Sequence, residues 1–110
     1  MLTREEFRKR RAVRDVVEGV FDERLRQNDR WGEQNHPDGT STEMWSPNAE
    51  LWKFRCDKAA REGAVTWKHI LLEEVYEALA EEDSTKLREE LIQVAAVAAA
   101  WVEAIDRRAA

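Results

Sequence analysis

Cysteine, proline and glycine are all scarce in this 110-residue sequence. Cys56 is the only cysteine, which excludes an internal disulfide and a zinc site built from several thiolates. No apolar run approaches the roughly 18 residues that a membrane-spanning helix needs, and the first residues are too polar for a signal peptide. These absences predict a cytoplasmic protein that does not associate with a membrane.

Positive charge is also in short supply, since 18 Lys and Arg residues face 23 Asp and Glu residues and leave a net charge of -5. A protein that coats nucleic acid has a basic excess, so we expect no nucleic acid polymer as a partner. Hydrophobic residues make up 43% and charged residues 37%, a mixture typical of amphipathic helices. The length predicts a single domain over residues 1–110.

Apolar residues recur at helical spacing in four stretches, and no stretch shows the alternation of a strand. The first helix is expected over about residues 3–29, with Thr3 as N-cap and Glu6 completing a capping box. The periodicity stops between residues 30 and 46, which predicts a long loop. Ser46 and Pro47 then read as the N-cap and first position of a second helix.

The second helix is expected to end at Gly63, and Thr66 to cap a third helix that ends in the acidic residues 81–83. Asp83 or Ser84 caps a fourth. The sequence therefore predicts an all-α four-helix bundle. Five tryptophans and the alanine-rich residues 95–100 give it more apolar surface than one small bundle hides, so we expect a homodimer or homotetramer.

Acidic residues lie beside the apolar faces of the last two helices. At 100° per residue, Glu74 and Glu77 continue the stripe of Trp67 and Ile70, and Glu90 and Gln93 border the apolar seam of the fourth helix. Half-buried carboxylates cost several kcal/mol each unless a cation neutralises them. Oxygen ligands alone suit Mg²⁺ or Mn²⁺, so the pattern predicts such a site, with an ordinary salt-bridge network as the alternative.

Glu73 is a separate case, because it lies about 100° around the helix from Glu74. It faces solvent, binds a second ion or orients a water molecule, and its position in the sequence leaves these alternatives open.

The segments Glu73-Glu74-Val75-Tyr76-Glu77 and Glu90-Leu91-Ile92-Gln93 resemble the motifs of the all-α nucleotide pyrophosphohydrolases, specifically the MazG-like group. Those motifs are Glu-Glu-x-x-Glu and, after a spacer, Glu-x-x-Asp. The resemblance covers about residues 66–107, and residues 30–40 look like the loop of small MazG-like members. Gln93 departs from the motif, because it stands in place of the aspartate.

The resemblance implies a MazG-like bundle completed by dimerisation, which hydrolyses a nucleoside or deoxynucleoside triphosphate to the monophosphate and pyrophosphate. By analogy, Glu74, Glu77, Glu90 and Gln93 hold Mg²⁺, or Mn²⁺, and Glu73 and Glu74 take part in catalysis. Because Gln93 brings no negative charge, a helical module that binds nucleotide or metal with little turnover is the alternative function. A helical assembly protein whose acids form only ion pairs is a third.

Further residues are candidates for contacts with the nucleotide. Trp31 is suited to stack on a base, and Gln34 and His36 to hydrogen-bond the base or the ribose. Anchoring of the loop by Trp31 and a surface position for His36 are the alternatives. The cationic candidates for phosphate are Arg30, Lys53 and Lys68, each of which also fits an ordinary surface charge.

Overall fold

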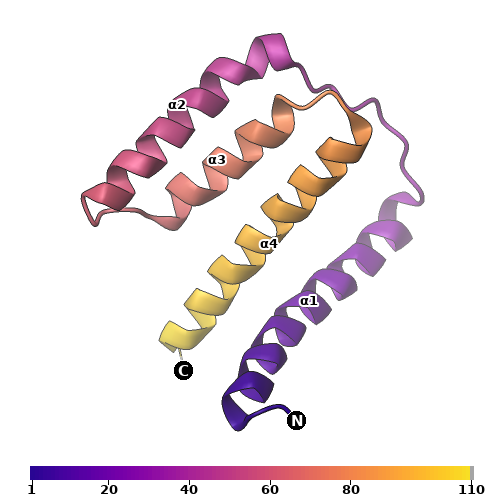
Figure 1. Ribbon diagram of the computed structural model, residues 1–110. Helices are drawn as coiled ribbons and strands as arrows, with labels where there is room; N and C mark the ends of the chain where they lie inside the picture. The colour runs from indigo at the N-terminus through magenta and orange to yellow at the C-terminus, as the bar shows by residue number, and fades with distance from the viewer. Residues whose placement is uncertain (110) are drawn as a thin grey trace. The chain divides into compact units, whose positions relative to one another are not determined.

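The computed structural model describes residues 1–109 and is all-helical (Figure 1). These residues form four helices and no strand: α1 (Arg4–Trp31), α2 (Thr42–Arg61), α3 (Trp67–Leu79) and α4 (Ser84–Ala109). The prediction of an all-α chain with four helices is thereby confirmed. Within the described residues no helix combines the length and the apolar character needed to cross a membrane.

Helix α1 begins with the predicted capping box. The Thr3 hydroxyl accepts the Glu6 N–H at 3.1 Å, and the Glu6 carboxylate accepts the Thr3 N–H at 2.7 Å. The helix ends at Gly32, whose φ of 70° is open to glycine and strained for other residues. Arg30 and Trp31, expected in the loop, instead form the last turn of α1.

The predicted start of α2 at Ser46 and Pro47 is wrong. Ser41 caps the helix by accepting the Met44 N–H at 3.1 Å, and Pro47 lies inside it. The reason is a set of contacts with the connection between α3 and α4, in which Thr42 donates its N–H to Glu82 and its hydroxyl to the Ala80 carbonyl. These bonds stabilise the first turn, and Pro47 removes only one backbone bond further along.

Helices α3 and α4 begin where the sequence predicts. Thr66 accepts the His69 N–H at 3.4 Å, and Asp83 accepts the Lys86 N–H at 3.0 Å. Helix α3 ends at Leu79, so the acidic residues 81–83 belong to the connection and not to the helix.

The chain divides into two compact units. The central unit, residues 38–98, contains α2, α3 and most of α4, and its buried residues are Cys56, Ala59, Ala78 and Leu87. Helices α2 and α3 pack along each other there, with the rings of Trp45 and Tyr76 centred 5.9 Å apart. The terminal unit contains α1 and the chain from residue 99 onward, with Val16 buried. That the whole chain is one domain stays a prediction.

Candidate metal site

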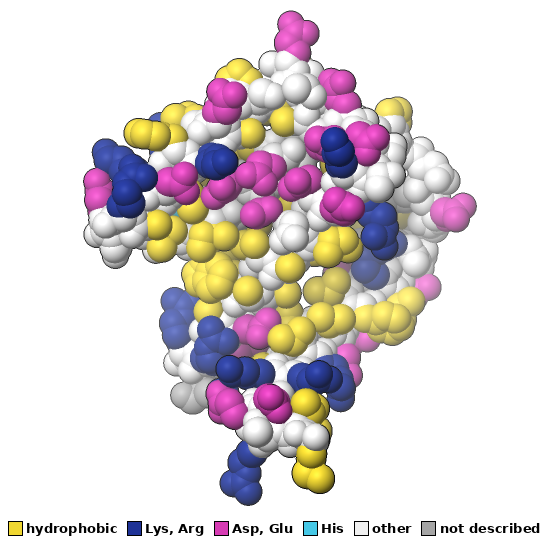
Figure 2. All heavy atoms as spheres, in the orientation of Figure 1, with side chains coloured by type: hydrophobic (Ala, Val, Ile, Leu, Met, Phe, Trp, Pro, Cys, Tyr) yellow, Lys and Arg dark blue, Asp and Glu magenta, His cyan; other side chains and the backbone are white. Residues whose placement is uncertain are grey.

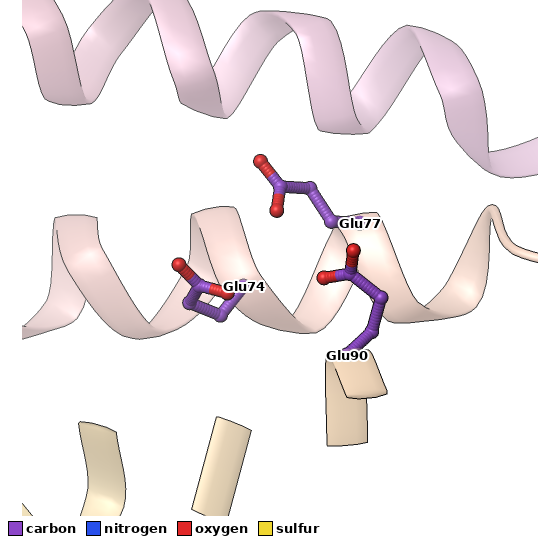
Figure 3. Close-up of side chains that lie close together, drawn as sticks. All are labelled: Glu74, Glu77 and Glu90. Atoms are coloured by element: carbon purple, nitrogen blue, oxygen red, sulfur yellow. The ribbon is translucent and has the colours of Figure 1, made fainter. Parts of the chain in front are cut away.

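Three carboxylates of the central unit converge (Figure 3). Glu74 and Glu77 are three residues apart and therefore share a face of α3, while Glu90 comes from α4 after the turn at Asp83. One oxygen from each carboxylate lies within 4.8 Å of the other two. Figure 2 shows Asp and Glu side chains gathered over α2 and α3. The sequence thus correctly predicted that these three acids come together.

The surroundings of the cluster oppose its ionisation. Burial raises the pKa of Glu74, and the nearby charges of Glu90 and Glu73 raise it further. Burial also raises the pKa of Glu77, followed by the charges of Glu74 and Glu90, while Lys53 of α2 lowers it slightly. Ionisation of Glu74 and Glu77 in the folded chain therefore costs free energy, because their charges are partly buried and repel one another.

Within the described part of the chain, no cation neutralises this charge through a salt bridge. The salt bridges that the described residues form are all in α1 and join Glu5 to Arg8, Glu5 to Lys9 and Glu23 to Arg26. Among residues 1–109, therefore, no Lys or Arg nitrogen lies within 4.0 Å of the clustered oxygens. This finding counts against the alternative of an internal salt-bridge network.

The donor set fits a small divalent cation. In octahedral Mg²⁺ sites with bonds of about 2.1 Å, neighbouring oxygens are about 3 Å apart and opposite ones about 4.2 Å apart. The oxygens of Glu74, Glu77 and Glu90 lie within 4.8 Å of one another, so small side-chain rotations bring them to these spacings. Three carboxylates leave further coordination positions for water or phosphate. A Mg²⁺ or Mn²⁺ ion is therefore chemically compatible with the cluster.

Glu73 lies on α3 and is half-buried. Burial raises the pKa of Cys56 to about 11, and a hydrogen bond and the charge of Glu73 add to this effect. Glu73 is thus near enough to Cys56 to act on the pKa of its thiol, and its side chain is only half-buried, so part of it remains accessible to solvent. Cys56 is buried, as a core residue should be. Whether Glu73 orients water or binds a second ion stays a prediction.

Gln93 differs from the three acids in its exposure. It lies on α4, three residues beyond Glu90, and is exposed, whereas Glu74, Glu77 and Glu90 are all half-buried. Its role as a fourth metal ligand stays a prediction.

The cationic candidates in the central unit have distinct surroundings. Lys53 is exposed on α2 and close enough to Glu77 to lower the pKa of that carboxyl. Lys68, in the first turn of α3, lines a groove of about 270 Å³. The sequence missed the other groove residues Trp52, Arg55, Lys58 and His69, although the spacing of Trp52, Arg55 and Lys58 places them on one face of α2. The Arg55 guanidinium lies 4.9 Å from the Trp52 ring centroid.

The remaining candidates belong to the terminal unit. Trp31 is 54% exposed, so the alternative that it anchors a loop in a core is wrong. The Arg30 guanidinium lies over its ring, 5.2 Å from the centroid. Gln34 and His36 are exposed in the extended segment after α1. A joint site that combines these residues with the carboxylates of the central unit stays a prediction.

No family model matches the chain, and the comparisons with curated proteins and with solved structures likewise find no match. The case for a function therefore depends on the two acidic motifs and on the geometry of their carboxylates.

Proposed function

We propose that this chain is a Mg²⁺-dependent hydrolase, also able to use Mn²⁺, that splits a nucleoside or deoxynucleoside triphosphate into the monophosphate and pyrophosphate. The observation that carries the proposal is the convergence of Glu74, Glu77 and Glu90 within 4.8 Å with no salt bridge to a described cation. The same three acids occupy the metal-binding positions of the motifs that the sequence resembles.

Each residue has a defined part in the proposed reaction. Glu74, Glu77 and Glu90 would hold the cation, which when bound offsets the charge of the triphosphate and favours ionisation of a water molecule. Glu73, next to Glu74 in sequence, accepts a proton from the attacking water. Lys53, whose positive charge lowers the pKa of Glu77, contacts a phosphate oxygen and holds the substrate against the cluster.

A second function, binding of nucleotide or metal with little turnover, is favoured by one residue. Gln93 is neutral where the resembled motif has aspartate, and it is exposed on α4. Three carboxylates without the fourth bind a divalent cation more weakly, which reduces the occupancy of the site at a given metal concentration.

The test combines a calorimetric titration with Mg²⁺ or Mn²⁺ and a pyrophosphate-release screen over canonical nucleoside triphosphates. Glu77→Gln should reduce metal affinity and turnover, the latter by about 100-fold or more, because it removes a charged ligand. Glu89→Gln is the matched control, since Glu89 is exposed next to Glu90 and lies outside the cluster. Absence of pyrophosphate release in the parent protein contradicts the hydrolase, and absence of both metal and nucleotide binding in the calorimeter contradicts the binding module as well.

The variant Gln93→Asp separates the two functions. A gain in pyrophosphate release shows an enzyme whose activity was limited by the missing charge. Tight nucleotide binding without turnover in both the parent and the variant shows a binding module.

A further inference from the structure

Three cationic side chains surround one groove at the end of α2 and the start of α3. Arg55 and Lys58 come from α2 and Lys68 from the first turn of α3, and the groove between them has a volume of about 270 Å³. Of the described residues that line it, Glu62 alone is acidic. In a chain with a net charge of -5, this groove is therefore a local region of positive charge.

The charges of these cations are not neutralised by the described part of the chain. The salt bridges of residues 1–109 all lie in α1, so none joins Arg55, Lys58 or Lys68 to a carboxylate. The Arg55 guanidinium instead lies over the Trp52 ring, 4.9 Å from its centroid. Stacking on a ring holds the plane of a guanidinium and leaves its N–H groups available as donors.

The first turn of α3 adds a further donor to the groove. Nδ1 of His69 accepts the Thr66 N–H at 3.1 Å, so the proton of the neutral imidazole is on Nε2, which is left as the donor of the ring. The same turn contains no acidic residue, although the N-terminal end of a helix favours negative charge, and Lys68 lies there instead. An anion in the groove would interact favourably with both the helix dipole and the lysine.

The groove lies on a different side of α3 from the carboxylate cluster. Lys68 and Glu77 are nine residues apart, which at about 100° per residue places them on opposite faces of the helix. On α2, the cation that acts on Glu77 is Lys53, and it lies about 160° around the helix from Arg55. A ligand in the groove is therefore held by a different set of residues from a cation in the cluster.

We propose that this groove binds a compact phosphate anion, whose charge Arg55, Lys58 and Lys68 neutralise and to which the Nε2–H of His69 donates a hydrogen bond. A guanidinium held against a ring can pair with two oxygens of a phosphate at once. The volume is below the roughly 300–1,000 Å³ of sites for drug-sized ligands, which favours a single phosphate group or pyrophosphate over a whole nucleotide. The site is independent of the metal site and stands or falls separately from the proposed function.

The test is a calorimetric titration of the full chain with inorganic phosphate and with pyrophosphate, in EDTA at low ionic strength. It should show one saturable site per chain, with tighter binding of pyrophosphate because that anion carries more charge. Since EDTA removes divalent metal, the carboxylate cluster repels both anions and does not contribute to the signal. Arg55→Gln and Lys68→Gln should each weaken binding about 10-fold, and Arg55→Lys, which keeps the charge but loses the paired donors, should weaken it less.

Two exposed lysines outside the groove supply the controls. Lys86→Gln is the matched control, because Lys86 is also exposed in the first turn of a helix but does not line the groove. Lys53→Gln reports on binding beside the carboxylate cluster. Neither control should change the affinity more than about 2-fold. Helical circular dichroism of every variant should match that of the parent, because each substituted side chain is exposed.

A phosphate monoester, glucose 6-phosphate, separates the two sources of such an anion. Binding as tight as that of inorganic phosphate assigns the groove to a phosphate group carried by a larger molecule, and much weaker binding assigns it to a free anion. Absence of saturable binding of both inorganic anions at about 10 mM overturns the proposal. An equal loss of affinity in a control variant and in Lys68→Gln also overturns it, because the anion then responds to the overall charge or binds elsewhere.

Discussion

Helices α1 and α3 have apolar residues at the same helical spacing but very different surroundings. Lys68 is the one exposed residue of α3, whereas Ala12, Val16 and Gln27 are the only residues of α1 that are not exposed; both helices lie wholly within residues 1–109. Apolar residues at helical spacing therefore predict that a segment is helical, but they do not predict whether other residues of the same chain bury the apolar face. The central unit covers α3 with its own residues, and the terminal unit leaves most of α1 accessible.

This difference explains why the carboxylate cluster forms in the central unit. Glu74 and Glu77 keep their positions because α3 packs along α2, so the carboxylate cluster needs only contacts within one chain. The apolar side chains of α1, by contrast, gain few contacts within residues 1–109, and most of them are exposed. The central unit should therefore account for most of the stability of the chain.

The largest expected effect is the contrast between two Leu→Ala substitutions. Leu87 is 7% exposed in the central unit, so Leu87→Ala should lower the free energy of unfolding by about 2–5 kcal/mol through lost burial and a residual cavity. Leu25 on α1 is 48% exposed, and Leu25→Ala should cost less than about 1 kcal/mol. Urea denaturation followed by circular dichroism measures both. Equal losses would show that α1 is as firmly packed as the central unit.

A change of pH is expected to have a smaller effect on stability, which acts through the carboxylate cluster. Burial and neighbouring charges raise the pKa values of Glu74 and Glu77 in the folded chain above the ordinary 4.5. The stability that these groups contribute is therefore fully present below pH 4.5 and is lost as the pH rises through their folded-state pKa values. Without divalent metal, the melting temperature of the central unit should fall over that window, and Mg²⁺ should restore it at neutral pH.

Glu77→Gln should flatten this pH dependence, because it removes one of the repelling charges, and it should also reduce the stabilisation by Mg²⁺. Glu89→Gln should retain the dependence of the parent. A metal-free protein whose melting temperature rises steadily from pH 4.5 to pH 7 contradicts the assignment of raised pKa values.

The sequence predicted the parts of the fold that depend on local interactions. Thr3 and Thr66 cap helices as expected, because each cap is formed with a residue three positions later. The start of α2 was missed because Thr42 bonds Glu82 and the Ala80 carbonyl, about forty residues away, and no local pattern indicates such contacts.

In the candidate site too, the sequence predicted what depends on local spacing and missed what depends on contacts between distant segments. The convergence of Glu74 and Glu77 follows from their spacing on one helix, and the short turn at Asp83 brings Glu90 near them. The effect of Glu73 on the pKa of Cys56 depends on how α2 packs against α3, so spacing along the sequence could not reveal it.

The smallest expected effect compares the caps of α2 and α1. Ser41→Ala should lower the free energy of unfolding by about 1 kcal/mol, because the Met44 N–H loses its partner at the start of a helix that is packed along α3. Thr3→Ala removes an equivalent bond to the Glu6 N–H, but there the first turn is exposed. That turn should fray, with faster amide hydrogen exchange and little change in the global unfolding midpoint. An equal shift of the midpoint for both variants would mean that the first turn of α1 unfolds only together with the rest of the chain.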